Sequence, residues 1–562
     1  MNKQILNDST EDFILKYRAA LKSKFTKEQL SNYLGILPKS IDRRRQKIYK
    51  NTGLELPQLP KVKNTTTTQS YETVLYDMAE QFGKSNAVNT NVKQITDIRQ
   101  NSRYVITAAQ NATPINDAFL ESLKIYCEHN NATLMIIPYR YKNPTSVWQT
   151  NDKSHDWWHP ALREYLIDDE LKVGKDIRIM GNIKIQPTAS NPLSGFDTIT
   201  GLDSAIFGHP NVELKVVPSA PTKFPKILAT TGAITVPNYT DSKAGHKGAY
   251  HHEYSAVIVE IDTDETFHIR HITSSSTGEF YDLDKLYTPN GATSNHRALA
   301  LVAGDLHSEV VDTTAFTSIF IDNSIAETVS PEVFVFHDVL DFSVRSHHNI
   351  RDSIGRYRKH LLGDNNNVEE ALQKMADLLY WVSECNPLSK NYVVKSNHDE
   401  HISRWLKEAD PNIDPENAKF YHYLKYHQYD AVSKGEAFDP IEFWCQHPDE
   451  EDGMDARTFS VTKFLNRHDN LEIGNIELSL HGDMGPNGAR GSLKNLSRLG
   501  QRVIIGHSHT PGISNGSYQV GTTSKLKLEY NNGPSSWLHT CAIIYPNGTV
   551  TLINVINGKW RI

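Results

Sequence analysis

Five groups of potential metal ligands follow one another in the last part of the chain, residues 297–562. They are Asp305-Leu306-His307, His337-Asp338-Val339-Leu340-Asp341, Asn397-His398-Asp399, His481-Gly482-Asp483 and His507-Ser508-His509. Carboxylate, amide and imidazole ligands without a thiolate favour manganese, with iron or zinc as alternatives. Residues two apart on an extended strand end point the same way, so Asp-x-His and His-x-His can each chelate from one side. The pattern therefore predicts a metal centre.

Each group follows a short apolar run that we expect to be a strand. The runs are Ala298–Ala303, Val333–Phe336, Tyr392–Lys395, Ile476–Leu480 and Arg502–Ile505. Helical patterns such as Val368–Val382 and Gly491–Leu499 lie between them. Strands that alternate with helices predict α/β layering, in which sites collect at the carboxyl ends of the strands. The alternative, that these polar side chains only cap strand ends, accounts for one such group more easily than for five in order.

The order of the groups resembles the calcineurin-like metallophosphoesterase family, whose pattern is GD-x-H, GD-x-x-D, GNHD, HG and GH-x-H. The resemblance implies two divalent metal ions that share the bridging ligand Asp338. The first ion would be held by Asp305, His307, Asp338 and His509, and the second by Asp338, Asn397, His481 and His507. The family also implies that His398 acts on the transition state and that Asp399 orients it. Such a pair of ions hydrolyses phosphodiesters by polarising the ester and activating water.

The same resemblance implies a sandwich of two sheets flanked by helices over residues 297–562, with a large insertion between Asp399 and Ile476. His337 and Ser396 stand where the family has glycine, which affects the geometry of the ligand loops more than the ligands themselves. The order of the groups is most similar to the double-strand-break-repair nuclease branch of the family.

A glycine-rich segment, residues 482–492, follows His481 and leads into the predicted helix that contains Lys494 and Arg498. Backbone amides at a helix start and an arginine side chain bind phosphate well. Arg490 is therefore a candidate for substrate binding. A surface turn without a ligand is the alternative.

The first 50 residues form a basic module. They contain 12 basic and 5 acidic residues, a net charge of +7, whereas the other 512 residues carry 47 basic and 61 acidic residues, a net charge of −14. A helix from Ser9 to about Ser23, a capping box that begins at Thr26, and a basic helix capped by Ser40 predict a helix-turn-helix-like, all-α module. Arg43, Arg44 and Lys47 are expected to face outward and to bind DNA. The alternative is a helical module that docks to a protein.

Residues 51–70 contain proline and a run of threonines without periodicity, which predicts a mobile linker. Residues 71–296 are expected to form a mixed α/β middle domain, to which the sequence assigns no role. Its predicted elements are a helix at Asn116–Glu128, a strand at Thr133–Pro138 and a hairpin of Ser255–Ile261 with Thr266–Ile272. Histidine clusters at residues 155–159 and 245–253 either line a nucleic-acid groove or are polar loop residues without such a role.

Composition restricts the class of protein further. The 562 residues have an overall net charge of −7 and four scattered cysteines without a CxxC pair, which predicts reduced thiols in the cytoplasm. No apolar stretch approaches the ~20 residues of a membrane span, and the amino terminus is not a signal peptide, so no membrane partner is expected.

We therefore expect a metal-dependent DNA nuclease with two divalent ions, preferably manganese. The whole chain also resembles the pre-early proteins of T-five-like phages that degrade host DNA, which implies a role in the host cytoplasm. Two alternatives stay open: a phosphomonoesterase that acts on protein or nucleotides, and a DNA-binding regulatory protein. Self-association into a homo-oligomer is also left open.

Overall fold

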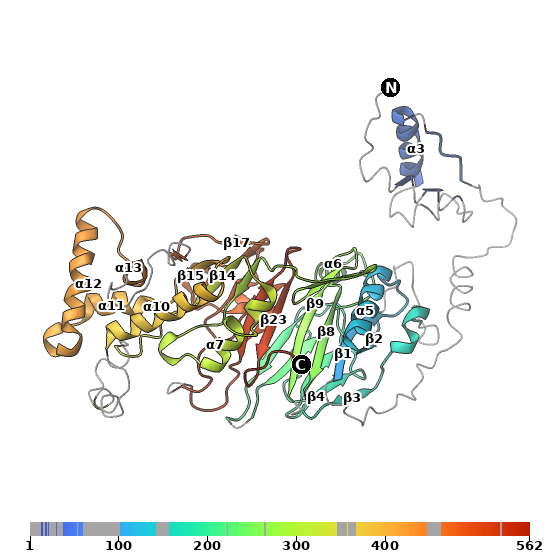
Figure 1. Ribbon diagram of the computed structural model, residues 1–562. Coiled ribbons are helices and arrows are strands. Elements are labelled where there is room, and N and C mark those ends of the chain that lie inside the picture. Colours follow the sequence, from blue (N-terminus) through green and yellow to red (C-terminus); the bar gives the residue numbers. More distant parts are fainter. Residues whose placement is uncertain are drawn as a thin grey trace. The chain divides into compact units, whose positions relative to one another are not determined.

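The computed structural model describes residues 13–14, 17–18, 21, 30, 38–52, 54–59, 102–141, 157–221, 223–262, 266–345, 354, 357, 367–446, 462–528 and 531–562 (Figure 1). The chain divides into two compact units, one of residues 1–84 with 145–149 and one of the remaining residues. We call the described residues 13–59 the head and the described residues 102–562 the body.

The head is a small helical unit around one basic helix, α3 (Pro38–Thr52). Ile41 and Ile48 of this helix are buried against Phe13, Tyr17 and Leu30. The opposite face of α3 exposes the predicted basic residues Arg43, Arg44 and Lys47. The helix begins at Pro38, a favoured residue in a first helical turn, so Ser40 lies inside the helix and the prediction that it is the cap is wrong.

The head extends into the segment predicted to be a mobile linker. Leu56 and Leu59 are buried in the core of the head. The Tyr17 hydroxyl donates a hydrogen bond to the Pro57 carbonyl at 2.8 Å, and the Arg45 guanidinium donates to the Leu56 carbonyl. The linker prediction is therefore wrong for residues 54–59, because two leucines supply apolar surface that the small helical core needs. The predicted capping box at Thr26 lies outside the described residues.

Two sheets form one layer of the body. The six-stranded sheet has the order β16-β15-β14-β13-β22-β23, and the four-stranded sheet has the order β2-β1-β8-β9. The first contains β13 (Ala300–Val302), β14 (Val333–His337), β15 (Lys390–Val394), β16 (Thr462–Leu465), β22 (His539–Ile544) and β23 (Val550–Val555). The second contains β1 (Ser102–Gln110), β2 (Ala132–Tyr139), β8 (Ser255–Ile261) and β9 (Phe267–Thr273). Strands β13 to β16 run parallel, so their carboxyl ends share one edge of the sheet.

A ten-stranded sheet forms the facing layer, in the order β17-β18-β19-β21-β20-β6-β7-β5-β4-β3. Its strands are β3 (Glu170–Val173), β4 (Ile177–Met180), β5 (Ser204–Phe207), β6 (Leu214–Val217), β7 (Lys226–Thr230), β17 (Glu472–Ile473), β18 (Ile476–Glu477), β19 (Arg502–Ile505), β20 (Gly512–Ser514) and β21 (Ser517–Gln519). Half of the strands come from before residue 296 and half from after it, and they meet where β6 pairs with β20. The body is accordingly one compact unit across the expected boundary at residues 296 and 297.

One hydrophobic core joins the two layers. It contains Val335 and Val394 from the six-stranded sheet together with Ile206, Ile227 and Ile504 from the ten-stranded sheet. Side chains that alternate between the two faces of a strand allow each sheet to contribute one face to this core. The predicted mixed α/β architecture is confirmed.

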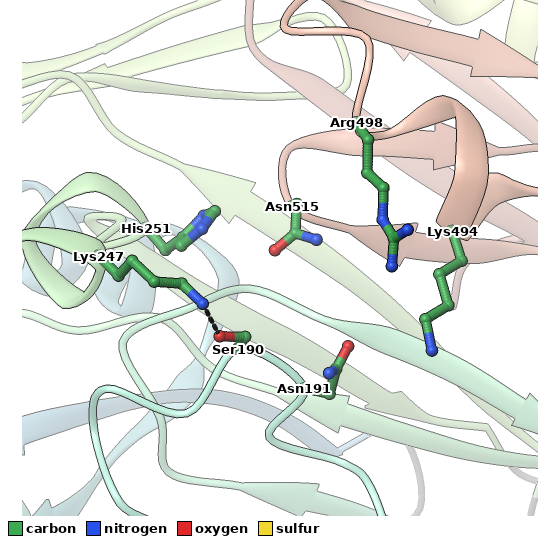
Figure 2. A pocket seen from close by; sticks show the side chains of 7 residues that line it. All are labelled: Ser190, Asn191, Lys247, His251, Lys494, Arg498 and Asn515. Carbon is green, nitrogen blue, oxygen red and sulfur yellow. Dashed lines mark hydrogen bonds between the residues drawn. The ribbon is translucent and has the colours of Figure 1, made fainter. Parts of the chain in front are cut away.

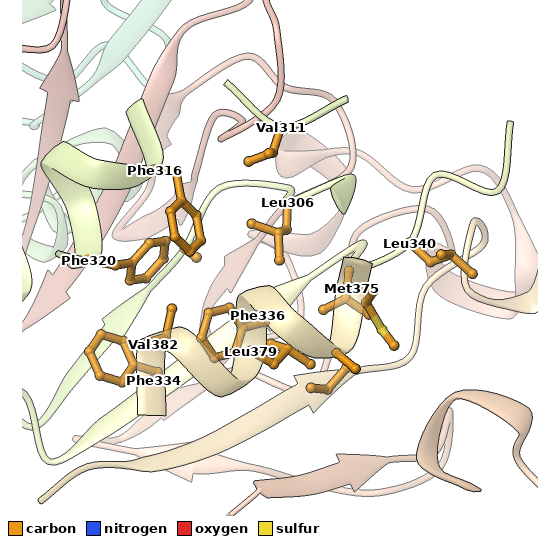
Figure 3. Packing of buried hydrophobic residues seen from close by; sticks show 14 of the residues in the cluster. Leu306, Val311, Phe316, Phe320, Phe334, Phe336, Leu340, Met375, Leu379 and Val382 are labelled. Carbon is orange, nitrogen blue, oxygen red and sulfur yellow. The ribbon is translucent and has the colours of Figure 1, made fainter. Parts of the chain in front are cut away.

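Helices cover the outer faces of the first layer. Helix α5 (Asp117–Asn130) packs on the four-stranded sheet, while α7 (Thr313–Phe320), α8 (Ile325–Val329) and α10 (Val368–Cys385) pack on the six-stranded sheet. Figure 3 shows Leu379 and Val382 of α10 against Phe334 and Phe336 of β14. The insertion before β16 contains α11 (Glu400–Glu408), α12 (Pro415–Ser433) and α13 (Pro440–Gln446).

The remaining described elements are short. Helix α6 (Lys243–Tyr250) and helix α15 (Leu493–Leu496) lie near the ten-stranded sheet, and β10 (Phe280–Asp282), β11 (Lys285–Thr288) and β12 (Gly291–Thr293) form a three-stranded sheet. Four predicted elements are confirmed within a few residues. They are the helix Asn116–Glu128, the strand Thr133–Pro138, the hairpin of Ser255–Ile261 with the following strand, and the helix Val368–Val382. The helix predicted over Gly491–Leu499 is shorter, because Ser492 caps it and the chain turns after Leu496. Among the described helices, none is long and apolar enough to cross a membrane.

Candidate metal centre

The predicted metal ligands come from five strand ends in two different sheets. Asp305, Asp338 and Asn397 follow the neighbouring parallel strands β13, β14 and β15. The other ligands, His481, His507 and His509, follow the parallel strands β18 and β19 of the ten-stranded sheet. Packing of the two sheets on one core therefore brings the two sets of strand ends together.

The first group of ligands is fully buried. Asp305, His307, Asp338 and His509 each offer a ligand atom, and these atoms all lie within 4.8 Å of one another. The Nε2 atoms of His307 and His509 are 3.0 Å apart, and Nε2 of His509 is 3.1 Å from a carboxylate oxygen of Asp305. Two ligand atoms that are each about 2.1 Å from one ion and at right angles are about 3 Å apart. The spacing matches that of ligands around a single cation.

The second group shares Asp338 with the first. The ligand atoms of Asp338, His481 and His507 lie within 4.8 Å of one another, and His481 Nε2 is 3.1 Å from Asp338 Oδ2. Asn397 follows the strand next to that of Asp338, and its Oδ1 is buried without a hydrogen-bond partner. Asp338 thus occupies the position expected of a bridging carboxylate.

Buried polar atoms without a hydrogen bond gather at this site. They include Oδ1 of Asp305, Asp338 and Asn397 and Nδ1 of His481 and His507. Burying a polar atom without a partner costs about 1–3 kcal/mol, so a folded protein rarely leaves several in one place. Divalent cations would satisfy these carboxylate, amide and imidazole atoms, and the set of donors fits manganese, iron or zinc. The residues present therefore fit a metal centre.

The backbone at the site is unusual. Four non-glycine ligands lie in the left-handed region, with φ of 44° at His307, 44° at Asp338, 74° at His507 and 58° at His509. Such residues are uncommon and cluster at functional sites, where the surrounding structure holds them. The prediction that the ligand pairs chelate from extended strand ends is wrong, because these side chains project from tight turns just beyond the strands. At Gly506, an added Cβ would lie 2.2 Å from Asp305 Oδ1, so only glycine permits this close approach between the sheets.

The carboxylates and histidines of the site are strongly coupled by charge. Burial alone would raise the pKa of Asp338, but the neighbouring His481 and His398 hold it well below its usual value. In turn, Asp338 overcomes the effect of burial on His481 and raises its pKa to about 9. The pKa values of His507 and His509 are lowered instead, because burial dominates. The site is therefore rich in carboxylate charge, which a divalent cation would balance.

The chain is 31% identical over 486 residues to Protein A1 of Escherichia phage T5, and the match covers 84% of this chain and 85% of that protein. The chain belongs to the Protein A1 family. No family model matches it, and no solved structure matches it. The predicted relationship to T-five-like phage proteins is confirmed, while the assignment to the metallophosphoesterases stays a prediction.

In this member of the Protein A1 family, the acid beside His398 is Asp341 rather than Asp399. Nδ1 of His398 lies 3.1 Å from the Asp341 carbonyl oxygen and 3.5 Å from its carboxylate. The hydrogen bonds of Asp399 go elsewhere, since its carboxylate accepts from the Leu340 amide and its own amide donates to Ser396 Oγ. The structure therefore places Asp399 as a support for the loop that follows β14, and burial together with Asp338 raises its pKa to about 6.

Two acidic residues of the site were missed as functional candidates. Asp341 also lies 3.3 Å from His307 Nδ1, and together with His307 and His398 it forms a third group of potential ligands. The second aspartate of the GD-x-x-D pattern was the signal for it. Glu309 is half-buried and accepts hydrogen bonds from the amides of Asp341 and Phe342, so it fixes this loop. No sequence pattern pointed to Glu309.

The remaining candidates lie around the site or apart from it. His337 is buried, its ring centre is 5.5 Å from that of His481, and burial lowers its pKa to about 4. Arg490 is exposed on the glycine-rich loop. Arg467 fixes the start of this loop through two hydrogen bonds to Asp483, at 2.8 and 2.9 Å. Arg43, Arg44 and Lys47 belong to the head, which is a separate unit.

Proposed function

We propose that this protein is a metal-dependent nuclease that hydrolyses the phosphodiester bonds of DNA. The observation that carries the proposal is the convergence of six aspartate and histidine side chains from two sheets, with buried oxygen and nitrogen atoms that have no hydrogen-bond partner, including Oδ1 of Asn397 on the adjoining strand end. The order of these residues along the chain resembles that of the calcineurin-like metallophosphoesterases, which supports phosphate-ester chemistry. Membership of a phage protein family supports the DNA of the infected bacterium as substrate.

The side chains of the centre have distinct tasks in this proposal. Asp305, His307 and His509 would hold one ion, and Asn397, His481 and His507 a second, with Asp338 shared between them. Ions bound there would supply Lewis-acid polarisation of the ester. His398 lies at the rim, with 24% of its side chain exposed, and Asp341 engages its Nδ1. That contact leaves Nε2 to hold a proton and donate it to the leaving oxygen, which is general-acid catalysis.

Hydrolysis assays test the proposal directly. Duplex DNA, a chromogenic phosphodiester and a chromogenic phosphomonoester would each be incubated with manganese, with magnesium or with chelator. We expect DNA and the diester to be cleaved with manganese and to be untouched in chelator. Activity that survives exhaustive chelation, or cleavage of the monoester alone, would contradict a metal-dependent nuclease.

The head provides a second test, since its exposed Arg43, Arg44 and Lys47 are proposed to contact DNA phosphates. Changing all three to alanine should remove up to about three phosphate contacts. Each contact contributes roughly 0.9 to the slope of log affinity against log salt concentration, so the slope should become less steep. A truncation for the same purpose should begin after Leu59, because Leu56 and Leu59 belong to the core of the head. Salt dependence identical to that of the unaltered chain would mean that the head docks to a protein instead.

A further inference from the structure

A basic pocket lies on the body and contains none of the metal ligands. Its volume is about 370 Å³, and it is lined by Ser190, Asn191, Lys247, His251, Lys494, Arg498 and Asn515 (Figure 2). Three of these side chains are cationic, the others are neutral hydrogen-bonding groups or histidine, and no carboxylate is among them. Pockets of 300–1,000 Å³ are the usual size for small-molecule ligands, but most of them are lined by apolar groups. The polarity of this one indicates an anionic ligand.

The pocket joins two distant parts of the sequence. Lys247 and His251 come from α6 and its carboxyl-terminal cap, in the histidine cluster of residues 245–253. Lys494 and Arg498 come from α15 and the turn that follows it, after the glycine-rich loop. Pairing of β6 with β20 in the ten-stranded sheet connects the two parts. Figure 2 shows these side chains arranged around a common space, with Asn515 between the two basic pairs.

Carboxylates neutralise the cations of this pocket less than they neutralise the cations on strands of the ten-stranded sheet. Lys215 pairs with Asp197, and Arg178 pairs with both Glu170 and Asp203. By contrast, within the described part of the chain, neither Lys494 nor Arg498 forms an ion pair. The carboxylate that Lys494 influences is Glu213, which is half-buried and accepts a hydrogen bond from the Leu193 amide.

Lys247, in turn, donates a hydrogen bond to the uncharged Ser190 hydroxyl. Uncompensated positive charge is thus concentrated in this pocket, although the chain outside its first 50 residues carries a net charge of −14.

We propose that this pocket binds phosphate groups of a DNA strand, as a second contact point away from the metal centre. Ammonium and guanidinium groups bind phosphate oxygens through charge-assisted hydrogen bonds, and asparagine and serine side chains supply further donors to the backbone of nucleic acids. The naming of DNA as the source of the phosphate rests on the proposed function. The inference that the pocket binds an anion does not depend on it.

The position of the pocket suits a polymeric ligand. Strand β19 begins at Arg502, four residues after Arg498, and leads to His507 at its other end. The Arg502 guanidinium bonds the carbonyl of Gly516, so the turn that contains Asn515 lies at the same end of β19 as Arg502. Four strand residues span about 13 Å. The length of β19 corresponds to about four base pairs of duplex at 3.4 Å each. The pocket and the metal centre thus lie toward opposite ends of one short strand, a separation that is small compared with a DNA duplex.

A triple variant of the full chain, Lys247→Ala, Lys494→Ala and Arg498→Ala, tests the proposal. Lys223→Ala, Lys243→Ala and Lys407→Ala together form the matched control, since they remove the same charge from exposed positions that do not line the pocket. Binding to a fluorescent DNA duplex would be measured in chelator at several salt concentrations, so the result does not depend on turnover. Hydrolysis of a small chromogenic phosphodiester with manganese would be measured in parallel.

We expect the pocket variant to bind DNA on the order of 10–100-fold more weakly than the control variant, with a salt slope smaller by up to about 2.7. Hydrolysis of the small diester should be unchanged, because that substrate does not span the two sites. DNA affinity and salt slope equal to those of the control would overturn the proposal. Pocket-dependent binding of inorganic phosphate or a deoxynucleoside monophosphate, with unchanged DNA affinity, would also overturn it and would identify a small anion as the ligand. Absence of the proposed nuclease function would appear separately, as a failure of the unaltered chain to cleave the small diester with manganese.

Discussion

Buried histidines occur in two parts of the body and have opposite electrostatic surroundings. In the metal centre, the imidazoles of His307 and His481 lie against carboxylates, which raise their pKa values to about 10 and 9 although burial opposes this. Elsewhere, at His209, His252 and His271, burial lowers each pKa to about 4. His209 and His271 are as fully buried as His307 and His481, and His252 is half-buried, so burial alone does not distinguish the two sets.

The difference lies in the hydrogen-bond partners. His252 Nε2 bonds the Thr235 carbonyl at 2.7 Å, and its Nδ1 pairs with the Tyr239 hydroxyl at 2.8 Å. His271 Nε2 bonds the Thr230 carbonyl at 2.7 Å. A neutral imidazole satisfied by neutral groups is part of the packing, whereas an imidazole beside a carboxylate and without a second partner is prepared for a cation. The partner, more than the histidine, therefore indicates function.

The largest effect should come from the carboxylate that both ligand groups share. Asp338→Ala should remove metal from both groups and lower turnover on the order of 10⁴-fold or more, because the ligands on either side lose their common partner. Metal content by mass spectrometry and DNA hydrolysis with manganese measure this. His271→Gln is the control and should keep the metal content of the unaltered chain. Full metal content in the Asp338 variant would contradict the view that a carboxylate partner distinguishes the metal-binding histidines from the packed ones.

The next effect concerns His398, which lies at the rim of the metal centre without being one of the seven predicted ligands. His398→Ala should keep both metals and lower turnover by about 10²–10⁴-fold, the usual contribution of a general acid. Asp341→Asn should reduce turnover, because Asp341 contacts His398. Asp399→Asn should lower thermal stability more than turnover, because Asp399 accepts a hydrogen bond from the Leu340 amide. Equal effects of the two aspartate variants on turnover at equal stability would contradict this assignment.

Acid should destabilise the body through the second set of histidines. Their folded-state pKa of about 4 lies below the usual value of about 6.5, so the neutral form stabilises the fold. This contribution is complete above pH ~6.5 and is lost progressively as the pH falls from 6.5 through 4. At pH 5 the loss is about 2 kcal/mol for each histidine. Urea unfolding of the chelated protein at pH 7 and pH 5 measures it. A free energy of unfolding that does not fall between these pH values would refute the neutral, packed state.

The smallest effect is expected for a single packed histidine. His252→Phe leaves the Tyr239 hydroxyl and the Thr235 carbonyl without their partner, so the free energy of unfolding should fall by about 1–3 kcal/mol. Metal content and turnover of the folded variant should match those of the unaltered chain. A selective loss of metal would show that the two sets of histidines are not independent.

From the sequence, the side chains that gather at the site could be predicted well, but their surroundings could not. Each ligand group directly follows its strand, so the local pattern was sufficient to find Asp305, Asp338 and His481. The left-handed turns at His307 and His509 have no local signal, because few non-glycine residues adopt that conformation and histidine, although enriched in it, usually does not.

The ten-stranded sheet was not predicted either. Its strands are two to five residues long, and β6 finds its partner β20 almost 300 residues further along the chain. The contacts of the cluster at residues 245–253 with Tyr239, Thr235 and the pocket that Arg498 lines could likewise not be predicted, because sequence spacing does not connect these residues.

The origin of the candidate ligands in two sheets links metal binding to folding. Neither sheet contains the complete set of candidate ligands, so full metal affinity would arise only when the two layers have closed on their common core. Ions that bind this closed state would stabilise it by about 2.7 kcal/mol at a concentration 100 times the dissociation constant. Metal supply and completion of folding are thereby thermodynamically linked. A chain that is still being synthesised, before β18 and β19 have emerged, lacks His481, His507 and His509. Its set of candidate ligands is therefore incomplete.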